Sequence, residues 1–477
     1  MSGLWIVLLG AGLGLYVATA WWHSRKPLPS GLKVTGPWRD AGDSRLLLDE
    51  TFLDADGQRH CRQQIVDEWL RLIGQARRLV MIDIFQFNDP ADSPPDCHRR
   101  VSFELVDALL ARKREMPELE IVLITDPINT AYGGHQATHL TELRAAGAQV
   151  IITRLSASRD PNPTWNALWR LAIRQWGNTT RNGWLPNPVG PGRATLRSYL
   201  AALNLNANHR KTLVVDDGDG WRAIVSSANL DDGSSDYRDL ALTLSGSAAL
   251  DLMASEAGIA GFSGASGLTV PTPPPAAQLS TATPRLRILS EGAIRDALLH
   301  TVETAQPGEQ LDIETLYLSH RGMIKALLGA HRRGVAIRVL LDPNKAHFGR
   351  PSPGIPNRQA SRDLHEAGIA VRWSDTRGEQ AHGKLLLRSG GNRPATLLAG
   401  SANLTRRSLD DLNLELNVQL EATLAHPAID RARDAFERHW HNTSHEHYST
   451  TYAAHADPSR LRYWRYRAME ASGWCVF

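Results

Sequence analysis

Short apolar runs alternate with amphipathic segments through most of the chain. The first half predicts a helix at 61–76, strands at 79–85, 121–126 and 150–152, and a further helix that ends at Gly147. Glycine commonly follows a last helical turn, and helices that alternate with apolar strands are typical of an α/β sheet flanked by helices.

The second half repeats this order, and in both halves a strand ends in an Asp-Pro turn, at Asp126 and at Asp342. This repeat indicates two related lobes of roughly 200 residues each. The elements predicted for the second half are helices at 293–304 and 323–333, a helix that ends at Gly368, and strands at 311–317, 336–342 and 369–372.

The amino terminus predicts a membrane anchor. Residues 1–22 carry no charged side chain, and the apolar run is long enough, at about 28 Å as a helix, to cross the hydrocarbon core. The stretch 18–20 fits a signal-peptidase site, but no lysine or arginine precedes the run, so we expect an uncleaved anchor. Arg25 and Lys26 then place the body on the cytoplasmic side, with a periplasmic or extracellular body as the alternative.

Proline-rich sequence around 271–277 reads as a linker between the lobes. The predicted organisation has four parts: an anchor with a short linker at 1–30, a first lobe at 31–262, a Pro/Ser/Thr-rich linker at 263–284 and a second lobe at 285–477.

Composition narrows the function classes. The chain has 477 residues, 42% of them hydrophobic and 22% charged, which excludes a disordered protein. With 53 basic and 50 acidic residues the net charge is +3, which argues against a dedicated nucleic-acid coat. Cys61, Cys97 and Cys475 cannot form a disulfide framework and lack zinc-site spacing, so we expect buried thiols, and the redox compartment stays open.

The strongest chemical signal in the first half is a strand that begins with a histidine and a lysine. His209 and Lys211 lead into this strand, and Asp216 ends it. Asn229 lies 20 residues after His209 and closes a second strand, and Asp239 follows.

The second half repeats the signal with His382 and Lys384, with Asn403 21 residues after the histidine, and with Glu415 downstream. Residues i and i+2 of a strand point the same way, so each histidine shares a face with its lysine. The same spacing places Ser227 beside Asn229, and Ser401 beside Asn403, on the neighbouring strand. Two such hairpins would surround one pocket.

These motifs resemble the phospholipase D superfamily, whose mark is H-x-K-x4-D followed by G-S-x-N, present twice. The resemblance implies a mixed α/β fold with two phospholipase D-like lobes and a pseudo-two-fold active site between them. The second copy has Ser389 where the family has aspartate, and the first has Ser226 in place of glycine. The offset from His382 to Ser389 is odd, so the missing carboxylate would point away from the catalytic face and is expected to be a structural loss.

The residue set suits phosphodiester chemistry without a cofactor or metal: one neutral histidine attacks phosphorus and a second, protonated histidine donates to the leaving alcohol. Lysines and asparagines would hold the non-bridging oxygens, and acidic residues would fix the imidazole tautomers. The resemblance implies that His209 is the nucleophile and His382 the acid. The predicted catalytic residues are His209, Lys211, Asp216, Asn229, Asp239, His382, Lys384, Asn403 and Glu415, with Ser227 and Ser401 as substrate-binding residues.

Three further stretches hold candidate residues. Tryptophans within 156–204 predict an interfacial helix or lid, a packed core helix, or a platform for stacked bases. The histidines of 439–447 look like a metal cluster but are expected to form a solvated face. The third stretch is a loop after a strand end, whose candidate headgroup-binding cations are Lys345, Arg350 and Arg358.

Three hypotheses follow. The first is a membrane-anchored phospholipase D or a cardiolipin-synthase-like phosphatidyltransferase, the second a metal-independent nuclease of the same superfamily, and the third a catalytically silent membrane scaffold. The first predicts phospholipid and membrane as partners, no nucleic acid, and a monomer, because both motifs lie in one chain.

Overall fold

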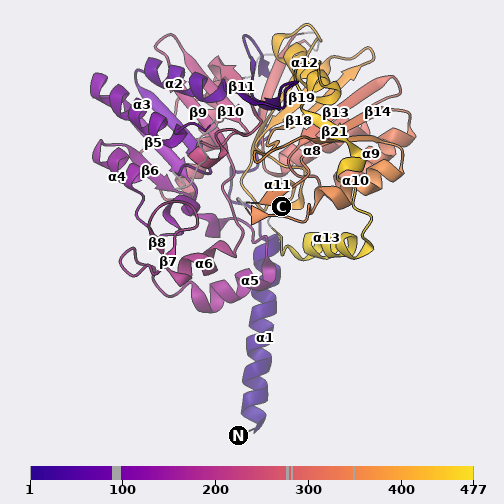
Figure 1. The fold of residues 1–477 in the computed structure, drawn as a ribbon. Coiled ribbons are helices and arrows are strands. Elements are labelled where there is room, and N and C mark those ends of the chain that lie inside the picture. The colour runs from indigo at the N-terminus through magenta and orange to yellow at the C-terminus, as the bar shows by residue number, and fades with distance from the viewer. Residues whose placement is uncertain (1, 89–97, 276–278, 281–282, 348–349, 476) are drawn as a thin grey trace.

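The computed structural model describes every residue except 1, 89–97, 276–278, 281–282, 348–349 and 476. A single long helix, α1 (Ser2–Arg25), projects from one end of a body made of two α/β lobes (Figure 1). The predicted fold class is therefore confirmed.

The first lobe is built on an eight-stranded mixed sheet. Its strands β4, β5 and β6 are parallel, and its other pairings are antiparallel. Helices α2 (Ile65–Gln75), α3 (Val101–Glu115) and α4 (Thr138–Ala145) pack on one face, and α7 (Gly246–Phe262) packs on the other. In spatial order the strands are β3 (Arg59–Arg62), β2 (Leu46–Leu53), β11 (Asp239–Ser245), β10 (Trp221–Ser226), β9 (Lys211–Asp216), β4 (Leu79–Ile84), β5 (Glu120–Thr125) and β6 (Gln149–Ile152).

The second lobe repeats this plan on a nine-stranded sheet. Helices α8 (Gly292–Glu303), α9 (Arg321–Arg332) and α10 (Asn357–Glu366) cover its outer face, and α12 (Pro427–His441) packs on the inner one. In spatial order the strands are β1 (Arg39–Asp40), β12 (Arg285–Ser290), β20 (Leu416–Ala422), β19 (Ala395–Gly400), β18 (Lys384–Gly390), β13 (Glu309–Thr315), β14 (Ala336–Leu341), β17 (Ala370–Ser374) and β21 (Ser449–Thr451).

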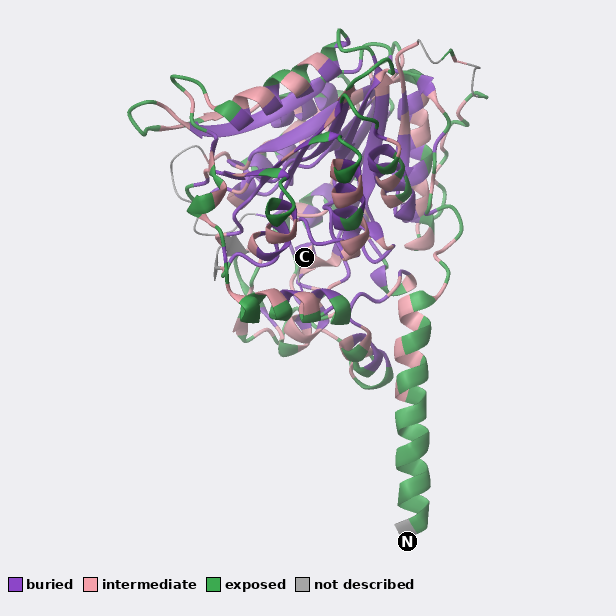
Figure 2. Cartoon of the chain, turned by 90° about the vertical axis from the view of Figure 1, so that its right-hand side faces the viewer, coloured by how far each residue is buried: buried purple, intermediate pink, exposed green. Residues whose placement is uncertain are grey.

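The duplication extends to strand order. The run β2-β11-β10-β9-β4-β5-β6 of the first sheet matches β12-β20-β19-β18-β13-β14-β17 of the second, with the same sequence of antiparallel and parallel pairs. A third hydrophobic core joins the lobes, because the inner faces of both sheets and helices α7 and α12 share one cluster of buried side chains. The sheets are consequently buried on both faces (Figure 2).

Two local features differ from the sequence analysis. Residues 61–62 belong to β3 rather than to a helix, because α2 begins only at Ile65. Strand β1, placed by the sequence in the first lobe, pairs with β12 and so extends the second sheet. The predicted linker at 263–284 lies between the end of α7 and the start of β12.

Smaller elements gather at the end from which α1 projects (Figure 1). The α1 span Gly3–Arg25 is long and apolar enough to cross a membrane. Its last turns contact the first lobe, where Tyr16 Oη donates to Thr164 O at 2.9 Å. The smaller elements at this end are α5 (Pro163–Leu168), a π-helical turn at Trp169–Ile173, β7 (Leu185–Pro186), β8 (Arg193–Ala194), α6 (Leu196–Ala202), α11 (Arg406–Leu409) and α13 (Arg460–Ser472). Two short strands, β15 (Ala346–His347) and β16 (Arg350–Pro351), pair elsewhere in the second lobe.

Candidate active site

The predicted histidines lie directly before two central strands, one in each lobe. Strand β9 begins at Lys211 and β18 at Lys384, so His209 and His382 occupy the approach to each strand. Their backbones are held by the opposite lobe: His209 N donates to Leu414 O at 2.8 Å, and His382 N donates to Arg238 O at 2.8 Å. The two half-sites are therefore related by a pseudo-two-fold arrangement.

Each histidine is hydrogen-bonded to the carboxylate of the other lobe. His209 Nδ1 lies 3.0 Å from Glu415 Oε2, and His382 Nδ1 lies 2.9 Å from Asp239 Oδ1. The two imidazole centroids are 6.5 Å apart. The sequence named both acids but could not tell which histidine each one serves, and the structure shows that the pairs are crossed.

The predicted serines support these carboxylates. Ser401 Oγ donates to Glu415 Oε2 at 2.5 Å, and Ser227 Oγ donates to Asp239. Both serines are fully buried. Each serine thus contacts and orients the carboxylate that binds a histidine.

The two lysines are buried beside the histidines, where Lys211 Nζ donates to His209 O at 2.6 Å and Lys384 Nζ donates to His382 O. Burial and the neighbouring Lys384 lower the pKa of Lys211 to about 7. Burial likewise lowers the pKa of Lys384 to about 8. A bound anion would stabilise the charged form of both lysines.

The imidazoles are neutral in the substrate-free site. Burial, reinforced by Lys211 and opposed by Glu415, lowers the pKa of His209 to about 3. Burial and Lys384 lower the pKa of His382 to about 4. The prediction that His382 is protonated when it acts as the acid therefore requires a bound substrate to raise this pKa.

The asparagines lie just beyond the strands that the sequence assigned to them. Strand β10 ends at Ser226 and β19 ends at Gly400, so Asn229 and Asn403 occupy the turns that follow. Asn229 Nδ2 donates to Gln86 Oε1 at 2.9 Å. Among the described residues, the buried Oδ1 atom of each asparagine has no hydrogen-bond partner.

This geometry agrees with the comparisons. A family model described as cardiolipin synthase, phospholipase D-like domain, matches residues 298–440. The second lobe therefore carries a phospholipase D-like domain. No curated protein sequence matches it.

Two solved structures are similar to this chain to different extents. The crystal structure of phosphatidylserine synthase from Haemophilus influenzae Rd KW20 is 11% identical, with a TM-score of 0.56 over 92% of this chain and 96% of that one. A phospholipase D family member, Nuc from Salmonella typhimurium, is 18% identical, with a TM-score of 0.28 over 34% of this chain and 99% of that one. The likeness to the first of these shows that both lobes share its fold.

The superfamily aspartate of the first motif is not brought into the site. Asp216 ends β9, five residues beyond Lys211, and accepts hydrogen bonds from the backbone N–H groups of Arg78 and Leu79 at 2.7 and 3.0 Å. Its predicted catalytic role is therefore corrected to a structural one, in which it fastens the end of β9 to the start of β4.

The second lobe fastens the equivalent end with a different carboxylate. Ser389 occupies the position of the missing aspartate and pairs in register with Gln310 of β13. The neighbouring Glu309 is buried and accepts from Gln306 N at 2.8 Å and from Arg393. A carboxylate at this strand end is thus supplied by β13 instead of β18.

Sequence reasoning missed a buried ionic cluster behind His209. Arg210 Nη2 donates to Glu291 Oε1 of the second lobe at 2.7 Å, and its Nη1 donates to Glu256 Oε2 at 3.2 Å. Glu291 Oε2 in turn accepts from Glu415 N at 3.1 Å. Glu291 adopts a positive φ of 55°, an uncommon conformation for which the sequence offers no signal.

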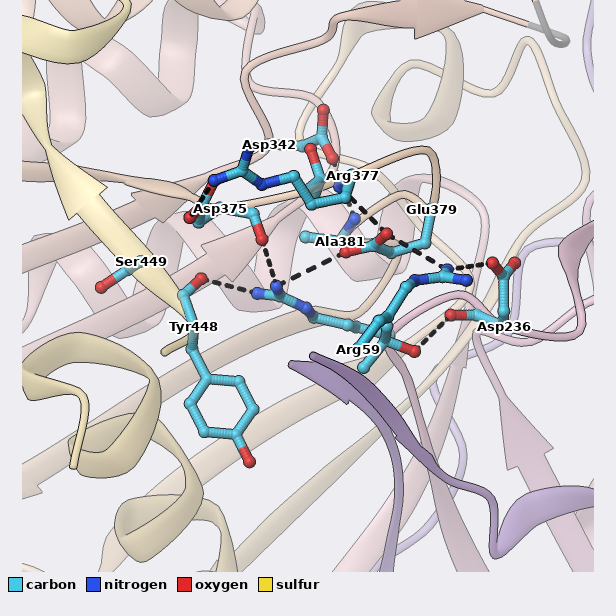
Figure 3. Close-up of polar contacts among 12 residues, drawn as sticks. Arg59, Asp236, Asp342, Asp375, Arg377, Glu379, Ala381, Tyr448 and Ser449 are labelled. Atoms are coloured by element: carbon cyan, nitrogen blue, oxygen red, sulfur yellow. Dashed lines mark hydrogen bonds and ion pairs between the residues drawn. The ribbon is translucent and has the colours of Figure 1, made fainter. Parts of the chain in front are cut away.

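A second missed network holds the backbone ahead of His382 (Figure 3). Arg238 donates to Tyr448 O at 2.7 Å and to Asp375 O at 2.6 Å. Ala381 N donates to Asp342 Oδ2 at 2.8 Å. These contacts, with the Arg59, Asp236 and Glu379 side chains beside them, fix the segment that carries the second histidine.

The other candidate stretches lie outside this site. His439 is buried and contacts two glutamates, so the prediction of a solvated face is wrong for it, whereas His441 and His445 are exposed. The described residues contain no group of three or more His, Cys, Asp or Glu side chains placed to hold a metal. Lys345 donates to Thr376 O at 2.8 Å and Arg358 donates to Pro343 O at 3.0 Å, while the side chain of Arg350 lies outside the described part.

The tryptophans divide between packing and exposure. Trp165 and Trp169 are half-buried, and Trp165 Nε1 donates to Leu200 O at 3.1 Å. Trp176 and Trp184 are exposed on the end that carries α1.

The cysteine prediction is partly wrong. Cys61 is disulfide-bonded, whereas Cys475 is a free buried thiol as expected, and Cys97 lies outside the described residues.

Proposed function

We propose that the protein is a membrane-anchored phosphodiesterase or phosphatidyltransferase that acts on glycerophospholipids through a phosphohistidine intermediate. The observation that carries this proposal is the pair of crossed histidine–carboxylate contacts, flanked by two buried lysines. Such a site supplies a nucleophile, an acid and cationic ligands for one phosphodiester.

In the first step, Nδ1–H of His209 donates to Glu415, which leaves the lone pair of Nε2 free to attack phosphorus. An N–P bond forms and the P–O bond to the leaving alcohol breaks. His382 gives its proton to that alcohol oxygen. The bound phosphodiester adds a negative charge to the site, so it favours both lysine ammonium groups and the His382 imidazolium.

In the second step, His382 accepts a proton from water or from an alcohol as that oxygen attacks the phosphohistidine. The P–O bond forms, the N–P bond breaks and His209 is regenerated. Water gives hydrolysis and an alcohol gives transfer. The amide N–H groups of Asn229 and Asn403 would bind the non-bridging oxygens.

Three observations favour a lipid over other phosphodiesters: the α1 span, the family match to a cardiolipin synthase-type domain and the fold shared with a phosphatidylserine synthase. The hydrogen bond from Tyr16 to Thr164 O of the first lobe supports an α1 that stays attached. This contact would be lost if cleavage followed Ala20.

For the sidedness, the disulfide at Cys61 favours a body on the oxidising side of the membrane, because disulfides are rare in the cytosol. This argument outweighs the two charges that placed the body in the cytoplasm. Labelling of a Glu118→Cys variant with a membrane-impermeant maleimide in intact cells or spheroplasts tests it. Labelling is expected, and protection until the membrane is permeabilised would restore the cytoplasmic orientation.

The activity test uses full-length protein in detergent with phosphatidylglycerol, phosphatidylethanolamine or phosphatidylcholine, EDTA, and glycerol present or absent. Mass spectrometry is expected to detect released headgroup or a transphosphatidylation product. The His209→Ala variant should be inactive, and the exposed His300→Ala variant should match the wild type. Loss of activity in EDTA that metal restores would refute the mechanism, and inactivity toward every lipid would refute the function.

A further inference from the structure

The first lobe has an open cavity of about 660 Å³ that the catalytic site does not use. It lies between α4 and the cover formed by α5, the π-helical turn and α6. Its apolar wall includes Leu140, Ile152, Leu155, Trp169 and Ala201. This volume is in the range of sites that bury a small ligand.

The cavity adjoins the end of the membrane-spanning helix. Its lining residues Ser156 and Asp160 also hold this end: Lys26 Nζ donates to Ser156 O at 3.0 Å, and Asp160 N donates to His23 O at 2.9 Å. Helix α5 lies beside α1 (Figure 1). The cavity is therefore at the level where a lipid headgroup would meet the protein.

The charged side chains around the cavity leave an excess of cations. Arg170 is neutralised by Asp160, with two contacts of 2.7 Å. The other three arginines of the lining, Arg144, Arg174 and Arg197, form no ion pair within the described part of the chain. These three positive charges suit an anion.

Arg197 is held in place by two neighbours and keeps a further N–H group for a ligand. Its guanidinium lies 5.0 Å from the Trp169 ring centroid, and its Nη2 donates to Arg174 O at 3.1 Å. Its Nε is buried and, among the described residues, has no hydrogen-bond partner. A buried donor without a partner costs stability unless a ligand satisfies it.

The surface around the cavity is suited to a bilayer. Leu168, Leu171, Trp176, Trp184 and Leu196 are exposed there, on the same end of the molecule as α1. Tryptophan and leucine beside arginine are typical of the membrane interface. An amphiphile could enter from this side without crossing water.

We propose that this cavity binds a glycerophospholipid with an anionic headgroup, with its phosphate on Arg174 and Arg197 and an acyl chain along the apolar wall. The inference rests on the proposed function for the class of ligand. The cavity also borders the catalytic segment, because Asn206 lines it three residues before His209. It would hold a donor or acceptor lipid next to the half-site that forms the phosphohistidine.

The test uses the full-length His209→Ala variant in nanodiscs that contain photoactivatable phosphatidylglycerol, with adducts located by mass spectrometry. Adducts on residues 165–201 are expected. An Arg174→Gln/Arg197→Gln pair added to this background should lower them at least roughly tenfold, since it removes the charge-assisted hydrogen bonds to the phosphate. The matched Arg181→Gln/Arg193→Gln pair, from exposed neighbours outside the cavity, should leave them unchanged.

Two further arms distinguish the ligand. Inorganic phosphate at millimolar concentration should not reduce the adducts, and full protection by it would assign the site to free phosphate. Equal labelling by photoactivatable phosphatidylcholine would refute anion recognition. An Ala201→Trp variant that fills the cavity, with its fold checked by circular dichroism, should also lose the adducts.

The outcomes separate the two proposals. Adducts in the cavity of a protein whose wild type turns over no lipid would refute the proposed function alone. An active wild type whose His209→Ala variant gives no cavity adducts would refute this inference alone.

Discussion

His439 joins the two lobes through a buried, charged contact, and its replacement by glutamine gives a sharp test of the structure. Its Nε2 lies 3.0 Å from Glu50 Oε1 of the first lobe, and its Nδ1 lies 2.9 Å from Glu314 Oε2 of the second. The imidazole is 4% exposed, so little water screens these pairs. In the His439→Gln variant, both glutamates would lose a cationic partner.

The size of this stabilisation follows from the pKa of His439. Burial opposes the charge, but Glu314 and Glu50 outweigh it and raise the pKa of His439 from 6.5 to about 9. At about 1.4 kcal/mol per tenfold change in proton affinity, this stabilises the folded state by about 3 kcal/mol. Because the folded pKa is the higher one, the stabilisation is complete below pH 6.5 and disappears as the pH rises through 9.

The assay is denaturant unfolding in detergent at several pH values from 6 to 10. The His439→Gln variant should lose about 3 kcal/mol of unfolding free energy at pH 6 and progressively less toward pH 10. The control is His441→Gln, an exposed position on the same helix, which should change little at any pH. A deficit that does not depend on pH would show that His439 acts by packing and would refute the ionic argument.

Three further predictions concern the catalytic site. As the pH rises through about 7 to 8, Lys211 and Lys384 lose their protons in the free enzyme, so kcat/KM for a soluble phosphodiester should fall there, and a flat profile would contradict this. Glu415→Gln should lower kcat by roughly 100-fold or more without unfolding the protein, because it removes the charge that orients the nucleophile; stopped-flow or steady-state assays with a circular dichroism check decide this. Asp216→Asn should lower the melting temperature while kcat stays within roughly tenfold of the wild type. Ser389→Asp should also keep kcat within roughly tenfold. A large loss of kcat in either variant would show that the position takes part in catalysis.

The repeat and the identity of the main strands could be predicted from the sequence, because they depend on local periodicity. Strand β4 starts at Leu79 and β13 covers Glu309–Thr315, within two residues of the predicted strands. His209 and His382 could also be predicted as site residues, because their spacing to lysine and asparagine is local in each half. Such patterns need no knowledge of how the lobes pack.

Contacts between the lobes could not be predicted, because each joins positions far apart in the sequence. His209 and Glu415 are 206 residues apart, and His439 and Glu50 are 389 apart. The odd offset of Ser389 from His382 predicts that this position points off the catalytic face. The sequence could not show that Asp216, predicted to be catalytic, instead binds backbone N–H groups at the start of β4. Local polarity favoured a solvated His439, and only the packing of α12 against both sheets overrides it.

The charges of the site explain why His382, the proposed acid, gains its proton only when substrate binds. Below pH 7, where Lys211 and Lys384 are both charged, they offset Glu415 and Asp239, so the free enzyme's site is electrically balanced with both imidazoles neutral. Burial, and after it the Lys384 ammonium, lowers the pKa of His382 to about 4. A phosphodiester brings one negative charge into the same buried space, and protonation of His382 is the change that restores the balance. The negative charge of the substrate thus favours the protonated His382 that its leaving group needs.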